Sequence, residues 1–94
     1  MSNTYDIAVV GATGLVGRQI ILILEERKFP VGRLYPLASE RSAGSLISFN
    51  HKDEEVEVLD DFDFEQVHLA LFSAGGPVSA KFAPKAADAG AVVI

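Results

Sequence analysis

The stretch Val9-Val10-Gly11-Ala12-Thr13-Gly14-Leu15-Val16-Gly17 decides how this chain folds. An apolar segment, Ile7 to Val10, leads into three glycines, and a segment rich in Leu, Ile and Glu follows. A strand, a glycine turn and a helix in this order are typical of a turn that binds a pyrophosphate. Gly11 allows a tight turn, Gly14 allows close approach of a ligand, and Gly17 lets the helix lie against the strand. A glycine-rich turn that binds nothing would share the pattern.

The start of the expected helix explains why phosphate would bind there. The first backbone N–H groups of a helix have no partner within the helix, and the helix dipole places partial positive charge at the same end. We therefore expect five residues of the turn to contact a dinucleotide: Gly11, Thr13, Gly14, Leu15 and Val16.

Composition narrows the class of protein. Ninety-four residues form one domain at most, so we treat residues 1–94 as a single dinucleotide-binding domain. The net charge of −5 argues against binding nucleic acid or an anionic membrane. The chain has no cysteine, and His51 and His68 lack partners at metal-ligand spacing, so no metal site is expected. Neither a membrane span nor a signal segment is visible, which makes a cytoplasmic protein the default expectation.

Hydrophobic patterning predicts alternating strands and helices along the rest of the chain. The expected strands lie at about 5–10, 33–38 and 67–72, and a helix between the first two is buried on a broad face and ends near Arg27. A helical segment follows the strand at 67–72, and Pro84 kinks or restarts it. Its apolar face is formed by Val78, Phe82, Ala86 and Ala89. Segments 45–49 and 55–59 are expected to pair as a hairpin, and a last strand begins at Ala91.

This order predicts an α/β fold: a doubly wound parallel sheet of the Rossmann type with helices on both faces. The elements account only for its amino-terminal part. Because the sequence stops within an apolar strand, at Ile94, we expect a truncated piece of a longer protein. Bare strand edges and apolar faces would then favour self-association.

Two loops are expected to choose and orient the cofactor. The loop after the strand at 33–38 carries one guanidinium and two hydroxyls, from Arg41, Ser39 and Ser42. These donors suit the 2′-phosphate of NADP. Glu40 in the same loop could instead bond a ribose hydroxyl and favour NAD. A second glycine turn follows the strand at 67–72, and we expect its residues to contact the nicotinamide side: Ser73, Ala74, Gly75 and Gly76.

Three segments together resemble bacterial-type aspartate-semialdehyde dehydrogenase: 11–17, 37–44 and 71–76. The resemblance extends to 24–30 and 83–94, so it covers nearly the whole chain, and the Ala-Ser-Glu-Arg-Ser-Ala-Gly loop at 38–44 is its most specific part. It implies an enzyme that reduces 4-phospho-L-aspartate to L-aspartate 4-semialdehyde with NADPH, on the route to lysine, methionine and threonine. It also implies that Arg41 and Ser42 bind the 2′-phosphate.

One departure from the family matters for activity. The family attacks its substrate with a cysteine thiolate, assisted by a histidine, and the present chain has no cysteine. We therefore expect it to contain no catalytic residue and to be the cofactor-binding part of the enzyme, with a catalytic and dimerisation portion missing. The alternatives are the corresponding part of an N-acetyl-gamma-glutamyl-phosphate reductase, which shares the chemistry but not the loop at 39–44, and a non-catalytic NADP-sensing module.

Overall fold

The computed structural model describes residues 4–73 and 75–94. Seven strands, two α-helices and two short 3-10 helices follow one another within this part of the chain. In order they are β1 (Tyr5–Val10), α1 (Leu15–Glu26), β2 (Val31–Ala38), β3 (Leu46–Phe49), β4 (Lys52–Glu55), β5 (Glu57–Val58), η1 (Leu59–Asp61), η2 (Phe64–Gln66), β6 (Leu69–Phe72), α2 (Gly76–Asp88) and β7 (Val92–Val93).

Five strands form one parallel sheet in the order β5-β2-β1-β6-β7. The chain runs outward from β1 to β2 on one side and later returns to β6 on the other side of β1. Val9 of β1 therefore lies opposite Pro36 of β2 and Leu71 of β6. The predicted α/β class is confirmed. A reversal of strand order of this kind opens a crevice at the carboxyl ends of the strands, where such folds bind ligands.

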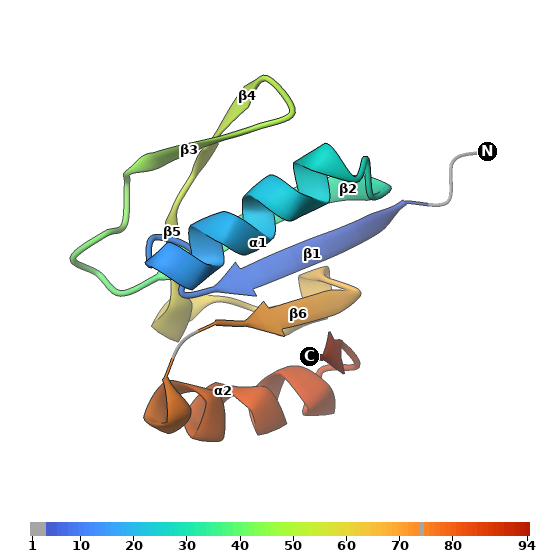
Figure 1. Cartoon of the computed structure of the whole chain (residues 1–94). Coiled ribbons are helices and arrows are strands. Elements are labelled where there is room, and N and C mark those ends of the chain that lie inside the picture. The colour runs from blue at the N-terminus through green and yellow to red at the C-terminus, as the bar shows by residue number, and fades with distance from the viewer. Residues whose placement is uncertain (1–3, 74) are drawn as a thin grey trace.

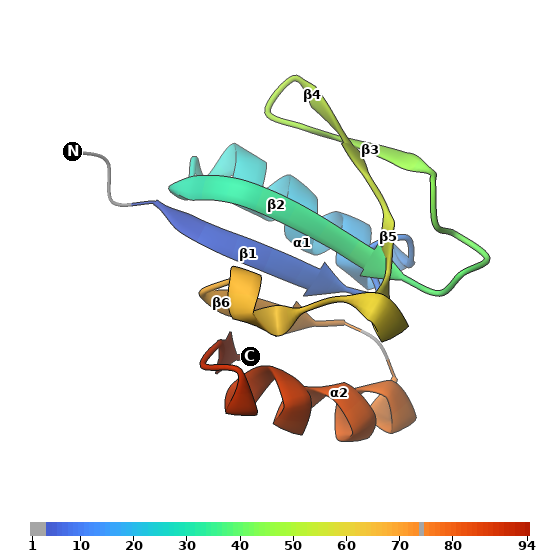
Figure 2. The ribbon, with the colours of Figure 1, turned by 180° about the vertical axis from the view of Figure 1, so that it is seen from behind.

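The helices cover opposite faces of the sheet, as Figures 1 and 2 show from two sides. Alternate residues of β1 serve the two faces because successive side chains of a strand point in opposite directions. Ile7 and Val9 pack with Ile21 of α1. Ala8 and Val10 pack on the other face, with α2 and the two 3-10 helices, in a cluster that also holds Tyr35, Leu37, Leu59, Phe62, Phe64, Val67, Ala70, Phe82, Ala86 and Ala91.

The predicted hairpin is correct in its first arm and wrong in its second. β3 pairs antiparallel with β4, so the second arm is 52–55 rather than 55–59. Asn50 and His51 both have positive φ angles, of 50° and 67°, which form a tight two-residue turn and bring Lys52 opposite Phe49. Glu57 and Val58 leave the hairpin and pair parallel with β2, where they complete the edge of the main sheet.

Helix α1 is buried on a narrower face than its sequence predicts. Ile21 is buried, whereas Leu22 and Ile23 are 44% and 41% exposed. At the start of the helix, Leu15 and Val16 are more exposed still. One layer of sheet can cover only one stripe of a helix, so the remaining apolar residues of this helix face outward.

Helix α2 is continuous from Gly76 to Asp88 and does not restart at Pro84. Its predicted apolar face is confirmed, since Phe82 and Ala86 are buried and the other two predicted residues pack against the same cluster. Neither helix in the described part of the chain is long and apolar enough to cross a membrane.

Candidate dinucleotide-binding site

The turn between β1 and α1 is held by its own backbone. Gly11 has φ of +86°, in the left-handed region that favours glycine. The N–H groups of Gly11 and Ala12 both donate to the carbonyl oxygen of Leu37, at 2.9 and 3.1 Å, and the N–H of Gly14 donates to the carbonyl oxygen of Gly11 at 3.1 Å. These bonds fix the turn against β2 before any ligand arrives.

Other amides of this turn remain available. Within the described chain, the N–H groups of Thr13, Leu15 and Val16 donate to no protein acceptor. Leu15 is 89% exposed, so the first turn of α1 faces solvent, and no acidic residue lies in that first turn. Free amides, the positive end of the helix dipole and the absence of a competing carboxylate together form a surface suited to phosphate.

Gly14 and Gly17 have different physical roles. A Cβ atom added at Gly17 would lie 2.1 Å from the carbonyl oxygen of Gly11, a distance that no real contact tolerates. Glycine at position 17 is therefore required for α1 to pack against the turn, as its position in the sequence suggested. A Cβ atom at Gly14 would be 3.4 Å from the same oxygen, an ordinary contact, so the fold by itself accepts a side chain there.

The loop after β2 lies beside the glycine turn. Its backbone forms a turn in which the N–H of Ser42 donates to the carbonyl oxygen of Ser39 at 3.0 Å. Ser42 is half-buried and its Oγ accepts a hydrogen bond of 3.4 Å from Oγ1 of Thr13. Arg41 is exposed. The structure thus brings together two groups of predicted residues that lie almost 30 positions apart in the sequence.

A pocket of about 620 Å³ lies at this carboxyl edge of the sheet. Four predicted contacts line it: Gly11, Thr13, Ser39 and Arg41. Glu40, the residue that could instead favour NAD, also lines the pocket. The opposite wall comes from η1 and α2, and it contributes four residues that the sequence analysis did not assign to the site: Leu59, Asp60, Val78 and Phe82.

Nothing local in the sequence marks that opposite wall as part of a site. Val78 and Phe82 fit the apolar face of α2, where they were predicted as core residues. They reach the pocket because α2 starts at the same edge of the sheet as α1, as Figure 2 shows. Only the crossing of α2 over the sheet brings this wall opposite the loop after β2.

The second glycine turn lies at the same edge, after β6. Ser73 is half-buried, and its Oγ donates to the carbonyl oxygen of Val10 at 2.8 Å and lies 3.2 Å from that of Gly11. Gly75 and Gly76 are exposed at the start of α2. Ala74, also predicted to contact the cofactor, lies outside the described residues.

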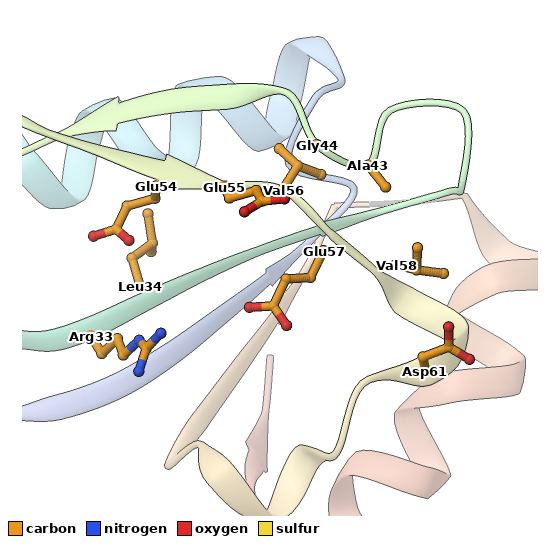
Figure 3. Close-up of a pocket in the computed structure, with 10 residues that line it drawn as sticks. All are labelled: Arg33, Leu34, Ala43, Gly44, Glu54, Glu55, Val56, Glu57, Val58 and Asp61. Carbon is orange, nitrogen blue, oxygen red and sulfur yellow. The ribbon is translucent and has the colours of Figure 1, made fainter.

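A different pocket, of about 470 Å³, lies beside β2, β4 and β5 and is shown in Figure 3. Its charged lining is mostly acidic, with Arg33 as its basic member and the carboxylates of Glu54, Glu55, Glu57 and Asp61. Such a lining repels a polyphosphate, so a dinucleotide is better suited to the edge that carries the free amides. The described residues contain no cluster of His, Cys, Asp or Glu suited to holding a metal ion.

Comparison with known proteins gives the class of this domain. Residues 6–94 match the sequence model of the semialdehyde dehydrogenase NAD-binding domain, and the chain belongs to this family. It is therefore part of an oxidoreductase family, and its fold and its matched region are those of a nicotinamide-dinucleotide-binding domain.

Several similar proteins are named aspartate-semialdehyde dehydrogenases. The chain is 55% identical over 94 residues to that of Shewanella violacea and 55% identical over 96 residues to that of Legionella pneumophila, and it spans 28% and 27% of their lengths. A crystal structure of aspartate semialdehyde dehydrogenase II from Vibrio cholerae, complexed with ASA, superposes with a TM-score of 0.95 at 53% identity. That match covers 97% of this chain and 30% of the other.

Proposed function

We propose that this chain is the NADP-binding part of an aspartate-semialdehyde dehydrogenase. The observation that carries the proposal is the pairing of two features across one pocket. The free amides of the glycine turn, next to Thr13, are suited to a pyrophosphate, and Arg41 on the neighbouring loop is suited to a 2′-phosphate.

The remaining parts of the pocket suit the rest of such a ligand. Leu59, Val78 and Phe82 offer an apolar wall against which a flat purine ring can lie. Ser39 and Ser42 flank Arg41 with further hydroxyl donors for the 2′-phosphate. Gly75 and Gly76 follow β6, the strand next to β1, and the nicotinamide half would extend to this part of the edge.

In this proposal the reduction is carried out by the full-length enzyme, of which this chain is the cofactor-binding part. Relatives with the same amino-terminal region are named aspartate-semialdehyde dehydrogenases, which supports reduction of 4-phospho-L-aspartate to L-aspartate 4-semialdehyde with NADPH. The bound cofactor would supply or accept hydride. This chain of 94 residues has no cysteine to serve as the acyl-carrying thiol, so it would bind cofactor without catalysing the reaction.

Calorimetric titration of the chain with NADP and with NAD tests the cofactor assignment. NADP should bind more tightly, and Arg41→Ala should remove most of that preference, about 1.5–3 kcal/mol for a charge-assisted contact. NAD binding should change little. Arg27→Ala, at the opposite end of α1, is the matched control and should leave both affinities unchanged. Equal affinity of the parent chain for the two nucleotides would refute the assignment, because Glu40 or Asp60 would then outweigh Arg41.

An absorbance assay at the NADPH band tests whether the chain lacks catalytic activity of its own. The purified chain with NADP, phosphate and aspartate semialdehyde should show no turnover above a blank. Turnover that survives removal of any contaminating full-length enzyme would show that the catalytic groups lie within these 94 residues.

Association of the chain with itself is a separate part of the proposal. Val92 of the edge strand β7 is 58% exposed and Ile94 is 71% exposed, and both lie beside an unpaired edge in the described sheet. Exposed apolar side chains on a strand edge favour pairing with another copy. Light scattering should give a mass that rises with concentration, and Val92→Lys should reduce the rise. A constant monomer mass would contradict this expectation.

A further inference from the structure

Ser73 uses its hydroxyl inside the protein. The residue directly follows β6, and its backbone N–H donates to the carbonyl oxygen of Val10 at 3.0 Å. Its Oγ donates to the same oxygen at 2.8 Å and lies 3.2 Å from the carbonyl oxygen of Gly11. A serine hydroxyl has one hydrogen. While that hydrogen is engaged with these carbonyls, Ser73 cannot donate it to a ligand.

The carbonyl oxygen of Gly11 contacts several parts of the glycine turn that is proposed to bind phosphate. It accepts from the N–H of Gly14 at 3.1 Å, lies beside the Ser73 hydroxyl, and occupies the space that a side chain at Gly17 would need. The direction of this carbonyl therefore sets where Gly14 lies and how closely α1 approaches. It also sets the direction of the free amides at the start of α1.

We propose that Ser73 is a positioning residue, which aligns the glycine turn after β1 with the second turn after β6 so that one dinucleotide can contact both. The inference rests on the proposed function, since it assumes that the turn binds the pyrophosphate. Without the hydroxyl, the carbonyl oxygen of Gly11 keeps its bond from Gly14 but loses its contact with the segment that follows β6. The backbone bond from the N–H of Ser73 to Val10 remains, so the strands stay in place while the Gly11 carbonyl is less restrained.

The distinguishing prediction compares a ligand that needs the turn with one that does not. In the proposed site NADP would contact both glycine turns, whereas adenosine 2′-phosphate carries the adenine and the 2′-phosphate but no pyrophosphate or nicotinamide half. In Ser73→Ala, NADP should bind about three- to tenfold more weakly, the range expected for one hydrogen bond. Binding of adenosine 2′-phosphate should stay within about twofold. The matched control is Ser48→Ala, on the exposed side of β3, which should change neither affinity.

Amide hydrogen exchange in the absence of nucleotide gives an independent measurement. The N–H of Gly14 should exchange faster in Ser73→Ala than in the parent chain, while amides of β1 keep their protection. Should Ser73→Ala fail to fold, Ser73→Cys retains a γ atom near the two carbonyls, with a slightly larger volume and a weaker donor, and is measured in the same way.

The outcomes separate this inference from the proposed function. If the parent chain does not bind NADP, the proposed function fails, and exchange at Gly14 still decides whether Ser73 positions the turn. Unchanged exchange at Gly14 would overturn the role of Ser73, as would unchanged NADP affinity in Ser73→Ala. An equal loss of NADP and adenosine 2′-phosphate would also overturn it, because that result indicates a general loss of structure.

Discussion

The two glycine turns at the carboxyl edge of the sheet look alike in sequence and differ in structure. In the first turn, Gly11 has a positive φ angle and Gly17 leaves no room for a side chain. In the second turn, Gly75 and Gly76 have open space where a Cβ atom would lie. The fold therefore requires glycine at positions 11 and 17 of the first turn and does not require it at positions 75 and 76 of the second, so any requirement there must come from a ligand.

The helices that follow these turns also differ as anion sites. At the start of α1, the amides of Thr13, Leu15 and Val16 are free within the described chain. At the start of α2, Pro77 has no N–H, and the N–H of Val78 donates to the carbonyl oxygen of Gly75 at 3.1 Å. The first helix can hold a phosphate with several amides, whereas at the second helix position 77 has no donor and the amide of Val78 is already used. A dinucleotide should therefore place its pyrophosphate at α1.

The largest expected effect is on stability, at Gly17. Gly17→Ala forces a methyl group against the backbone oxygen of Gly11, and overpacking against backbone should cost about 3 kcal/mol in the free energy of unfolding. Urea denaturation followed by circular dichroism measures the loss. A variant as stable as the parent would mean that α1 can move away from the turn at little cost. Glycine would then be no more necessary for folding in the first turn than in the second.

Gly14→Ala should act on binding and leave the fold intact. The added methyl group makes an ordinary contact at 3.4 Å in the free protein. In the proposed site it would hinder the close approach of the pyrophosphate to the turn. NADP and NAD should both bind about tenfold more weakly, equivalent to about 1.4 kcal/mol, whereas Arg41→Ala affects NADP alone. Calorimetry with both nucleotides measures this. Normal NADP binding by a folded Gly14→Ala chain would place the pyrophosphate elsewhere.

The smallest effect is expected at Gly76, the first residue of α2. Gly76→Ala has open space and replaces a poor helix former by a good one, so the free energy of unfolding should rise or stay within about 0.5 kcal/mol. The same titrations then show whether the second turn touches the ligand: weaker NADP binding without loss of stability indicates contact. Destabilisation comparable to that of Gly17→Ala would contradict the difference between the turns.

Much of the fold could be predicted because its signals are local. The order of strand, glycine turn and helix depends on residues within about ten positions of one another, and Gly17 was assigned its packing role from spacing alone. The second arm of the hairpin was assigned wrongly. Weak alternation at 55–59 does not show that Glu57 and Val58 pair with β2, because pairing depends on a strand twenty residues away.

The sequence by itself determined the class of fold, the order of its main elements and the place of the glycine turn, since periodicity and glycine spacing act over short distances. Tertiary structure alone decided which stripe of α1 is buried, that Leu59, Asp60, Val78 and Phe82 face the loop after β2, and that the hydroxyl of Ser73 reaches the carbonyls of Val10 and Gly11. These features join segments up to 63 residues apart. They arise from the packing of whole elements on the sheet, and no local pattern specifies them.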